Sequence, residues 1–371
     1  MSSGLVVDEV GPAETSISFS PRSILVTGGA GFLASHLVTF VLQKYADYKV
    51  IVIDKLDFCS SRKNLPLVGS DRLKFIQGDI LSDNLLRFVL ASERIDTVIH
   101  FAAQTNYDDS IGNRLDFTLN NAVGTHVLLE ACREYGAVKR FLNVSTDQVY
   151  GGIPELGPRH EFTERCSLEP NNPYSAAKAG AEMIAHAYLT SYGLPVMSIR
   201  TNNVYGPRQY PNKLIPKFVM LSLVGRPLPV HGDGSLKRSY LYVDDAVDAF
   251  DIILHKGTIG DVYNVGTTVE RTIGEVAEAI CKHFARDPQA SIAHNPERGF
   301  NERRYHLDVS KMERLGWRER TPFEVGLKKT IEWFSRHDLA DYWENGTVEL
   351  ALQDFSVAQQ SPNGYFNLVM R

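Results

Sequence analysis

A glycine-rich turn near the N-terminus constrains the fold of this chain more than any other feature. The apolar run 23–27 leads directly into the turn 28–31, and a helical pattern follows it. Gly28 allows a tight turn, Gly31 lets a pyrophosphate approach the backbone, and the small Ala34 permits close packing of helix on strand. The N-terminus of that helix then faces the phosphates. The segment therefore predicts a strand, a turn and a helix that bind a dinucleotide.

Similar strand and helix units repeat along the first half of the chain. Apolar runs that read as strands occupy residues 50–53, 73–77, 97–101, 140–145 and 195–200. Amphipathic patterns that read as helices occupy residues 83–92, 118–135 and 174–192. Units of about 25 to 30 residues specify an α/β fold, a Rossmann-like doubly wound parallel sheet. Two later helices are expected at about 272–284 and 322–335, the second with Thr321 as its N-cap.

The regular alternation fails after about residue 205, which predicts a smaller C-terminal substrate-binding domain. We expect four parts: a flexible N-terminal arm over 1–22, a dinucleotide-binding domain over 23–205, a mainly substrate-binding domain over 206–340, and a peripheral tail over 341–371. Segments near 240–265 are expected to return to the first domain.

A carboxylate after the second predicted strand indicates which dinucleotide binds. Asp54 lies roughly 20 residues beyond the glycine turn, where a carboxylate accepts hydrogen bonds from ribose hydroxyls and repels a 2′-phosphate. NAD is therefore favoured over NADP. Lys55 and Arg62 nearby keep the NADP option open.

Composition and charge exclude several classes of protein. A chain of 371 residues with 43% hydrophobic content can bury a large core. A net charge of −5 without a long basic run argues against a nucleic-acid surface. No stretch approaches the roughly 20 apolar residues of a membrane span, and four scattered cysteines indicate free thiols, so we expect a cytoplasmic protein. No metal site is expected, and His100 reads as a core histidine.

Two short stretches carry the candidate chemistry. A buried strand is predicted to deliver Ser145, Thr146 and Asp147 to a crevice. If Tyr174 lies near the start of a helix, Lys178 sits one turn further along the same face. A free tyrosine titrates at about 10, and a cation beside it favours the phenolate, which takes a proton from an alcohol. Either stretch alone is weak, because such spacings arise by chance and Ser-Thr-Asp also caps helices.

Taken together, the motifs make the chain similar to a known family. Over roughly residues 23–336 it resembles the extended short-chain dehydrogenase/reductases, and within them the nucleotide-diphosphate-sugar 4,6-dehydratases that act on UDP-glucose or dTDP-glucose. The stretches that carry the resemblance are 27–36, 54–57, 78–80, 100–105, 145–147, 172–178, 202–207 and 231–238. The stretch 210–217 looks like the UDP-glucose enzymes of rhamnose synthesis, which favours UDP on resemblance alone.

The resemblance implies a reaction and roles for the residues that match. Tyr174, aided by Lys178 and Thr146, would take the proton of the sugar 4-hydroxyl while hydride passes from C4 to NAD. A base then removes the C5 proton, Asp147 protonates the departing 6-hydroxyl, and hydride returns to C6. The product is a 4-keto-6-deoxy sugar nucleotide, and NAD is regenerated in each cycle.

The resemblance also implies binding residues and a homodimer. The cofactor would be held, besides Tyr174 and Lys178, by Gly28, Gly31, Phe32, Leu33, Asp54, Lys55, Asp79, Ile80, Phe101, Ala102 and Ala103. The nucleotide-diphosphate sugar would be held by Thr105, Asn203, Lys217, Arg238, Asn264, Arg298 and Tyr305. The three arginines within 298–305 also suit a diphosphate apart from the resemblance, because their guanidinium groups are planar. Pairing through helices 118–135 and 174–192 would make the dimer.

Two departures from the family pattern bear on the reaction. Gln148 stands where these dehydratases carry the glutamate that removes the C5 proton, and losing a general base typically costs about 10² to 10⁴ in rate. Residues 106–108 read Asn-Tyr-Asp where His-Val-Asp is common. Either another group, such as Asp108, Asp109 or a water, takes the role, or elimination is slow or absent. A substitution introduced to trap substrate would read the same way.

Two alternatives to a dehydratase therefore stay open. An oxidoreductase that stops at the 4-ketone, or a 4-epimerase, needs Tyr174 and Lys178 but not Asp147 with its glutamate. A catalytically impaired paralogue that binds NAD and a sugar nucleotide is favoured by Gln148, whereas the intact Thr146 and Asp147 argue against it.

Overall fold

A parallel sheet forms the centre of the molecule. The computed structural model describes residues 19–66, 71–105, 114–152, 161–296, 306–343 and 348–353. Seven strands pair in the order β10-β6-β5-β4-β1-β2-β3, all in parallel register. They are β1 (Ser23–Thr27), β2 (Lys49–Asp54), β3 (Leu73–Gln77), β4 (Thr97–His100), β5 (Arg140–Thr146), β6 (Val196–Thr201) and β10 (Val262–Val265). The predicted doubly wound α/β fold is confirmed, and its strand order reverses between β1 and β4.

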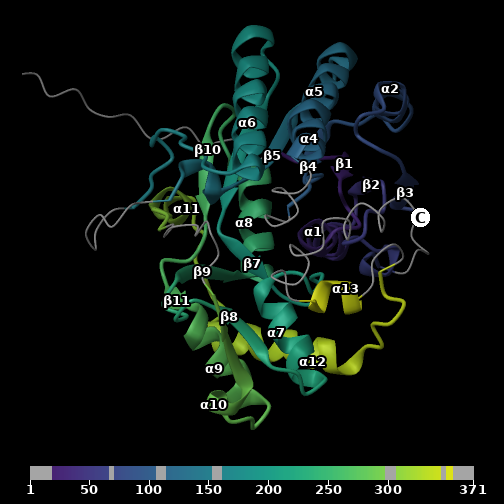
Figure 1. Ribbon diagram of the computed structural model, residues 1–371. Helices are drawn as coiled ribbons and strands as arrows, with labels where there is room; N and C mark the ends of the chain where they lie inside the picture. The colour runs from purple at the N-terminus through teal and green to yellow at the C-terminus, as the bar shows by residue number, and fades with distance from the viewer. Residues whose placement is uncertain are drawn as a thin grey trace, which may run out of the picture.

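Helices cover both faces of this sheet (Figure 1). On one face, α1 (Phe32–Lys44) packs against α8 (Val243–Lys256). On the other, α5 (Gly124–Tyr135) lies between α2 (Asp83–Ser92) and α6 (Pro173–Tyr192). Alternate residues of β1 enter the two cores: Ile24 and Val26 pack with the α1 side, and Leu25 with the α2 side. A strand buried on both faces explains the continuous apolar runs of the sequence.

The helix expected over 118–135 is interrupted near its start. A short helix α4 (Arg114–Thr118) passes into a π-helical turn, η2 (Leu119–Val123), before α5 begins. Buried side chains in and after this turn bond elsewhere: Asn121 exchanges hydrogen bonds with the backbone of Gln104 at 2.8 and 2.9 Å. Thr125 donates to the Asn121 carbonyl at 2.6 Å. Such single π turns often occur at functional sites.

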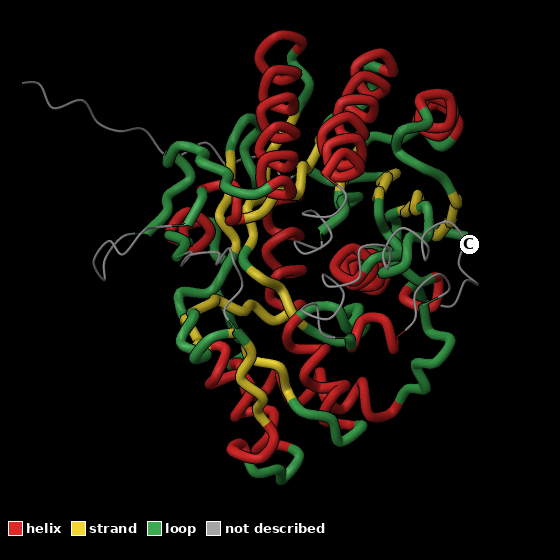
Figure 2. Tube along the Cα trace, in the orientation of Figure 1, coloured by secondary structure: helices red, strands yellow, loops and turns green. Residues whose placement is uncertain are grey.

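A smaller lobe lies below the sheet in Figure 1, and Figure 2 shows that it mixes short strands with helices. A three-stranded sheet has the order β11-β9-β7, and a two-stranded sheet pairs β12 with β8. The strands are β7 (Asn203–Tyr205), β8 (Leu228–His231), β9 (Lys237–Tyr242), β11 (Glu270–Thr272) and β12 (Ile292–Asn295). The helices are α7 (Leu214–Leu223), α9 (Ile273–His283), α10 (Pro288–Ser291), α12 (Phe323–Arg336) and α13 (Val348–Leu352). The short helix α11 (Ser310–Arg314) packs beside β10 instead, and short 3₁₀ turns are η1 (Arg62–Asn64) and η3 (Asp147–Tyr150).

The N-cap expected for the helix near 322 was wrong by one residue. Pro322, not Thr321, precedes the first turn of α12, and no side chain caps it. The reason is a contact outside the helix, because the carboxylate of Asp245 accepts the backbone N–H groups of Arg320 and Thr321 at 3.1 and 3.0 Å. Through this contact, α8 fixes the segment that leads into α12.

The segment after α12 packs on the body, although the sequence had suggested a peripheral tail from residue 341. Trp343 is 2% exposed and meets Tyr210 edge to face at 5.1 Å. The Tyr342 hydroxyl donates to Asn64 at 3.0 Å, and Glu349 of α13 pairs with Arg226 at 3.1 Å. The described residues 341–343 and 348–353 thus join the two lobes. Within the described ranges, none of the helices has the length and apolar character needed to cross a bilayer.

Candidate active site

The carboxyl end of β5 delivers the first half of the site. Thr146 ends the strand and caps η3, its hydroxyl accepting the N–H of Gln148 at 3.3 Å. Asp147 follows and is only 3% exposed. Its carboxylate accepts hydrogen bonds from the Thr146 hydroxyl at 3.2 Å and from the Asn202 side-chain amide at 2.8 Å. The acid is therefore held in a fixed orientation.

Asn202 is a residue that the sequence reading missed. It follows β6, and the pairing of Thr146 with Thr201 brings the ends of β5 and β6 side by side. Its side-chain oxygen accepts the N–H of Thr267 at 3.0 Å, which leaves the amide nitrogen directed at Asp147. A Cβ at Gly266 would lie 1.9 Å from that oxygen, so this glycine is required. Its position at a strand end was the available signal.

The second half of the site comes from the start of α6. Asn172 caps the helix in a reciprocal pair with Ser175, and a proline at the first position fixes the entry of the chain. Tyr174 lies in the first turn, 7% exposed, with its ring edge to face with Phe117 at 6.4 Å. Lys178 lies one turn further on the same face.

Lys178 is buried close to the strand that carries Thr146. Its ammonium group donates to the carbonyl of Val144 at 2.6 Å, and the residue is only 3% exposed. Burial lowers the pKa of Lys178 to about 8, and the carboxylate of Glu182 acts in the opposite direction. Because α6 packs against both β5 and η3, the structure brings the tyrosine–lysine pair to the turn that holds Asp147.

Several of the buried polar atoms without a hydrogen-bond partner lie at the same edge of the sheet. Among the described residues they include the side-chain oxygens of Gln104, Ser145 and Gln148 and both amide atoms of Asn143. These residues lie in or just beyond β4 and β5. Buried polar groups are nearly always paired in folded proteins, so such a group of atoms fits a site for polar ligands.

The glycine turn has the geometry that a dinucleotide needs. Gly28 has a φ of +68°, and a Cβ there would lie 2.7 Å from the backbone of Ala102. Gly31 precedes α1, whose first turn has neither a side-chain cap nor an acidic residue. The first amides of α1, at Phe32 and Leu33, are thus suited to an anion.

Asp54 is placed to hold a ribose. It is 7% exposed, and its carboxylate accepts from the N–H of Ala30 at 3.0 Å, the N–H of Leu56 at 2.8 Å and the Ser60 hydroxyl at 3.1 Å. A carboxylate has about four acceptor positions, so one remains for a hydroxyl donor. Burial raises the pKa of Asp54 despite these bonds. The ammonium group of Lys55 donates to the side-chain oxygen of Asn120 at 3.1 Å. The residues present at this strand end fit NAD.

The other expected cofactor residues flank this crevice. Asp79 accepts the N–H of Leu81 at 2.9 Å, and Ile80 is buried beside Gly124, where a Cβ would lie 2.6 Å from it. Both follow the end of β3. Phe101, half-buried, stands edge to face with Phe250 at 5.4 Å, and the half-buried Ala102 and Ala103 continue the chain from β4.

His100 belongs to the core, as expected. Its Nδ1 lies 2.7 Å from the Thr27 hydroxyl and its Nε2 lies 2.9 Å from the Thr125 hydroxyl. Burial and the charge of Lys178 lower the pKa of His100 to about 3, so the ring is neutral.

The expected substrate residues divide into three groups. The half-buried Asn203 and Arg238 lie on neighbouring strands, β7 and β9. Thr105 and Lys217 contact protein groups: the Thr105 carbonyl accepts from Lys213 at 2.6 Å, and Lys217 donates to the carbonyl of Gln353 at 2.7 Å. Arg298, Tyr305 and the segment 106–109 lie outside the described residues.

Asn264, which we expect to bind substrate, lies fully buried in β10. Its side-chain oxygen accepts from Tyr150 at 2.8 Å, and its amide nitrogen donates to the carbonyls of Phe162 and Asp308 at 2.8 and 3.2 Å. The amide oxygen keeps a second acceptor position, so the substrate role of Asn264 stays a prediction.

Comparison with known proteins identifies the family. The family model described as GDP-mannose 4,6 dehydratase matches residues 25–330. The chain belongs to the 4,6-dehydratase family. Its members include the short-chain dehydrogenase/reductase enzymes that act on nucleotide-diphosphate sugars.

Curated relatives include dehydratases from plants and animals. A trifunctional UDP-glucose 4,6-dehydratase/UDP-4-keto-6-deoxy-D-glucose 3,5-epimerase/UDP-4-keto-L-rhamnose-reductase of Arabidopsis thaliana is 52% identical over 350 residues, 94% of this chain and 51% of the plant protein. The chain thus spans about half the length of these first relatives. The dTDP-D-glucose 4,6-dehydratase of Mus musculus is 41% identical over 346 residues, 92% of this chain and 95% of the mouse protein.

Solved structures of the 4,6-dehydratase family share the fold. The dTDP-glucose 4,6-dehydratase of Streptomyces venezuelae, solved with NAD bound, superposes with a TM-score of 0.81 at 39% identity, covering 87% of this chain and 99% of that one. The UDP-glucose 4-epimerase of Thermotoga maritima, solved with UDP-glucose, gives a TM-score of 0.77 at 31% identity, covering 85% and 99%. The fold of this dehydratase-family chain is therefore similar to that of an epimerase as well.

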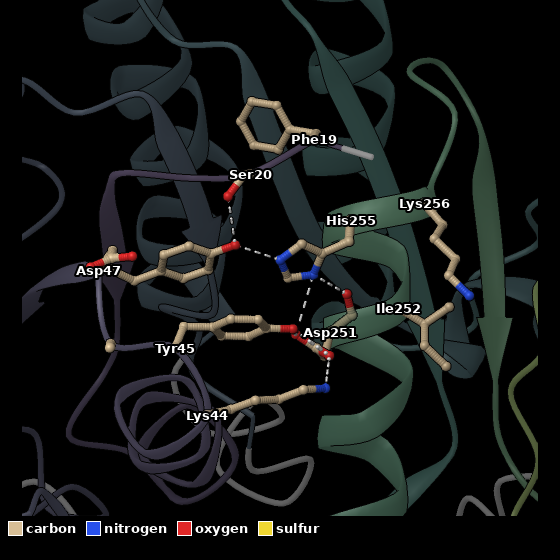
Figure 3. A pocket seen from close by; sticks show the side chains of 11 residues that line it. Phe19, Ser20, Lys44, Tyr45, Asp47, Asp251, Ile252, His255 and Lys256 are labelled. Carbon is tan, nitrogen blue, oxygen red and sulfur yellow. Dashed lines mark hydrogen bonds and ion pairs between the residues drawn. The ribbon is translucent and has the colours of Figure 1, made fainter. Parts of the chain in front are cut away.

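A distinct pocket lies at the opposite edge of the sheet, where α1 ends and β2 begins (Figure 3). Its volume is about 600 Å³. Tyr45 and Tyr48 stack on each other at 4.4 Å, and Tyr48 bonds His255 at 2.9 Å. Asp251 accepts from Lys44 at 2.7 Å and from Tyr45 at 2.9 Å. These polar side chains of the dehydratase-family chain satisfy one another.

Proposed function

We propose that this chain catalyses the NAD-dependent 4,6-dehydration of a nucleotide-diphosphate glucose to the 4-keto-6-deoxy sugar nucleotide. The observation that carries this proposal is Asp147, fixed by Asn202 and Thr146 at the turn packed against the helix of Tyr174 and Lys178. An acid for water loss beside a base for alcohol oxidation is the combination that dehydration needs.

Bound NAD supplies a hydride acceptor that is restored within each cycle. Tyr174 acts as the base that takes the proton of the sugar 4-hydroxyl. The cation of Lys178 lowers the cost of forming the phenolate, because an opposite charge nearby favours the charged form of an acid. The Thr146 hydroxyl, at the end of β5, holds the sugar oxygen as its proton leaves.

Asp147 delivers the proton to the departing 6-hydroxyl. Its carboxyl group has one oxygen bonded to Thr146 and the other to Asn202, so its orientation does not depend on substrate. A catalytic group that is already oriented avoids ordering costs at the moment of reaction.

The base for the C5 proton is the unsettled part of the proposed cycle. Gln148 occupies the matching place, with a buried side-chain oxygen that has no partner among the described residues. An amide does not take up a proton at neutral pH. Asp108 or Asp109 is the candidate replacement, and we expect elimination to be slow relative to C4 oxidation.

A second function is favoured by the same residue. Oxidation at C4 followed by return of hydride to C4, as a 4-epimerase performs, needs Tyr174 and Lys178 but no base at position 148. The similarity of the fold to the Thermotoga UDP-glucose 4-epimerase supports this alternative.

UDP-glucose is the substrate we place first. The plant relatives named for UDP-glucose are 51% to 52% identical, whereas the mouse relative named for dTDP-glucose is 41% identical. Both nucleotides share the diphosphate and glucose groups on which the reaction depends.

We further propose a cytoplasmic homodimer without nucleic-acid or membrane partners. The helices α4 to α6 expose a row of apolar side chains that a second copy would cover. Leu115, Leu119 and Val123 are 68%, 40% and 40% exposed at four-residue spacing, and Met183 on α6 is 59% exposed. Sedimentation showing only monomer at micromolar concentration would contradict the dimer.

The reaction itself is tested by NMR of UDP-glucose incubated with the protein and NAD in deuterated water. Dehydration produces a C6 methyl group and deuterium at C5. Deuterium at C5 without water loss would show that C5 is deprotonated but elimination fails. A galactose configuration without deuterium favours the epimerase, and unchanged substrate despite binding would overturn both proposals.

A further inference from the structure

The face of α6 that carries the catalytic pair continues to a buried carboxylate. Tyr174, Lys178 and Glu182 follow one another at four-residue spacing, so they share one face of the helix. Lys178 is 3% exposed and Glu182 is 5% exposed. Two opposite charges thus lie one turn apart in the interior, on the same helix as the proposed base.

Arg200, on the neighbouring strand β6, fixes this carboxylate. Its Nε donates to the two oxygens of Glu182 at 3.0 and 3.2 Å, and its Nη2 donates to Oε1 as well. Its Nη1 donates to the Tyr150 hydroxyl at 2.7 Å, and its guanidinium lies 4.7 Å over the same ring. Tyr150 closes the η3 turn that begins at Asp147. The ion pair therefore also connects the two halves of the site.

Few groups around Lys178 favour its charged form. The Val144 carbonyl accepts one hydrogen bond at 2.6 Å. His100, facing from β4, is neutral because burial and Lys178 itself lower its pKa to about 3. Burial lowers the pKa of Lys178, and Glu182 is the charge that raises it. Arg200 bonds Glu182 from β6, and Tyr150 of η3 bonds Arg200. The carboxylate of Glu164 acts on Tyr150 from the next segment.

We propose that Glu182, held by Arg200, is a positioning residue whose buried charge keeps the ammonium of Lys178 protonated beside Tyr174. The residue acts on Tyr174 through Lys178 and needs no contact with substrate. The inference rests on the proposed function in that it takes Tyr174 as the base of the reaction. Because tyrosine and lysine titrate as a coupled pair, their apparent pKa values belong to both groups.

The test is the pH titration of Tyr174 in the NAD-loaded protein. The ultraviolet absorbance of tyrosinate is followed from about pH 6 to pH 10, and the signal of the Tyr174→Phe variant is subtracted. In Glu182→Gln we expect the Tyr174-dependent step to move upward by about one pH unit, because loss of the lysine charge disfavours the phenolate. The low-pH side of the plot of reaction rate against pH should also move upward in pH.

Three variants separate this role from a merely structural one. Glu182→Asp keeps the charge and should restore the step. Adding Glu182→Gln to a Lys178→Met background should leave the step where Lys178→Met alone puts it. The matched control is Glu93→Gln, which removes another shielded carboxylate paired with Lys49 and Lys74 at 2.7 and 2.5 Å but lies far from α6; its titration should equal that of the unaltered protein.

Folding is controlled by a double substitution. Removing one partner of a buried ion pair is strongly destabilising, whereas replacing both by apolar residues of similar volume is often neutral. Glu182→Met with Arg200→Met therefore tests the same point if Glu182→Gln does not fold, with the same upward shift expected.

The outcomes distinguish this inference from the proposed function. A folded, NAD-binding Glu182→Gln or double variant with an unmoved Tyr174 step overturns the inference, whatever its activity. A shifted step in a protein that leaves UDP-glucose unchanged supports the role of Glu182 and contradicts the proposed function instead.

Discussion

The carboxyl ends of the central strands form one edge of the sheet, the carboxyl edge, and their amino ends form the other, the amino edge. Each edge holds a cluster of aromatic and ionisable side chains, and the clusters differ in how their polar atoms are used. At the carboxyl edge, Ser145 and Gln148 bury polar atoms that have no partner among the described residues. Lys178 is buried there without a carboxylate bonded to it. That edge is where parallel α/β sheets bind their ligands.

At the amino edge the polar atoms are used up within the cluster. Asp251 accepts from Lys44 and Tyr45, and Tyr48 lies between His255 and Ser20 at 2.9 and 3.1 Å. This is where the pocket of Figure 3 lies. A hollow lined by rings and charges is thus a poorer sign of function than buried polar atoms that the protein itself does not pair.

The largest expected effect is on the base at the carboxyl edge. Tyr174→Phe should lower the rate of product formation by about 10² to 10⁴, because the proton acceptor is removed. Its counterpart at the amino edge, Tyr45→Phe, should leave kcat unchanged and lower the free energy of unfolding by about 1 kcal/mol through a lost hydrogen bond. Equal losses of kcat in the two variants would erase the contrast between the edges.

Restoring a carboxylate at position 148 should have the next largest effect. Gln148→Glu is expected to increase the rate of dehydration by about 10², because it supplies a general base for the C5 proton. The readout is the appearance of the 4-keto-6-deoxy product under saturating substrate. No increase would mean that a different group already removes that proton.

Loosening Asp147 should cost less than removing a reacting group. Asn202→Ala deletes the 2.8 Å hydrogen bond to the carboxylate and should slow dehydration by about 10- to 100-fold, the range for one bond to a charged group. Oxidation at C4 should change little, since Tyr174 and Lys178 are untouched. If single-turnover kinetics showed equal losses in C4 oxidation and in dehydration, Asn202 would support the fold and not the orientation of Asp147.

The smallest effect is expected at the amino edge. Asp251→Asn should lower the free energy of unfolding by about 1 to 2 kcal/mol and leave kcat unchanged. Although burial opposes it, hydrogen bonds from His255, Lys44 and Tyr45 lower the pKa of Asp251 below its usual value.

The sign of the pH dependence follows from that shift. Because the pKa of Asp251 is lower in the folded state, its charge stabilises the protein at pH values above the unfolded pKa of about 3.9. This stabilisation is lost as the pH falls through the folded pKa. Denaturation curves of the native and Asp251→Asn proteins should therefore converge below about pH 4. A constant difference at all pH values would show that packing, not charge, stabilises this edge.

Local patterns were sufficient for most of the fold. The strand over 73–77 and the helix over 83–92 were predicted with the bounds that the structure has, because apolar periodicity follows burial directly. Thr146, Asp147, Tyr174 and Lys178 were identified from motif spacing, and the structure brings their elements together.

What the sequence did not reveal depends on contacts between distant segments. The bond from Asn202 to Asp147 joins residues 55 positions apart, and Trp343 is buried against Tyr210, which lies far from it in the sequence. A motif match gives the position of a residue such as Asn264 in the chain but not the partners of its side chain. The π turn at 119–123 holds Asn121, whose side chain bonds the distant backbone of Gln104.

The spacing along α6 has a consequence for how sequences of this kind can change over time. Each residue added to a helix turns everything beyond it by about 100°. A single-residue insertion between Tyr174 and Glu182 would keep the helix and its apolar content yet rotate the residues after it away from their strands. We therefore expect surviving variants of this chain to accept exchanges on the outer side of α6 freely, while deletions and insertions within these two turns are eliminated.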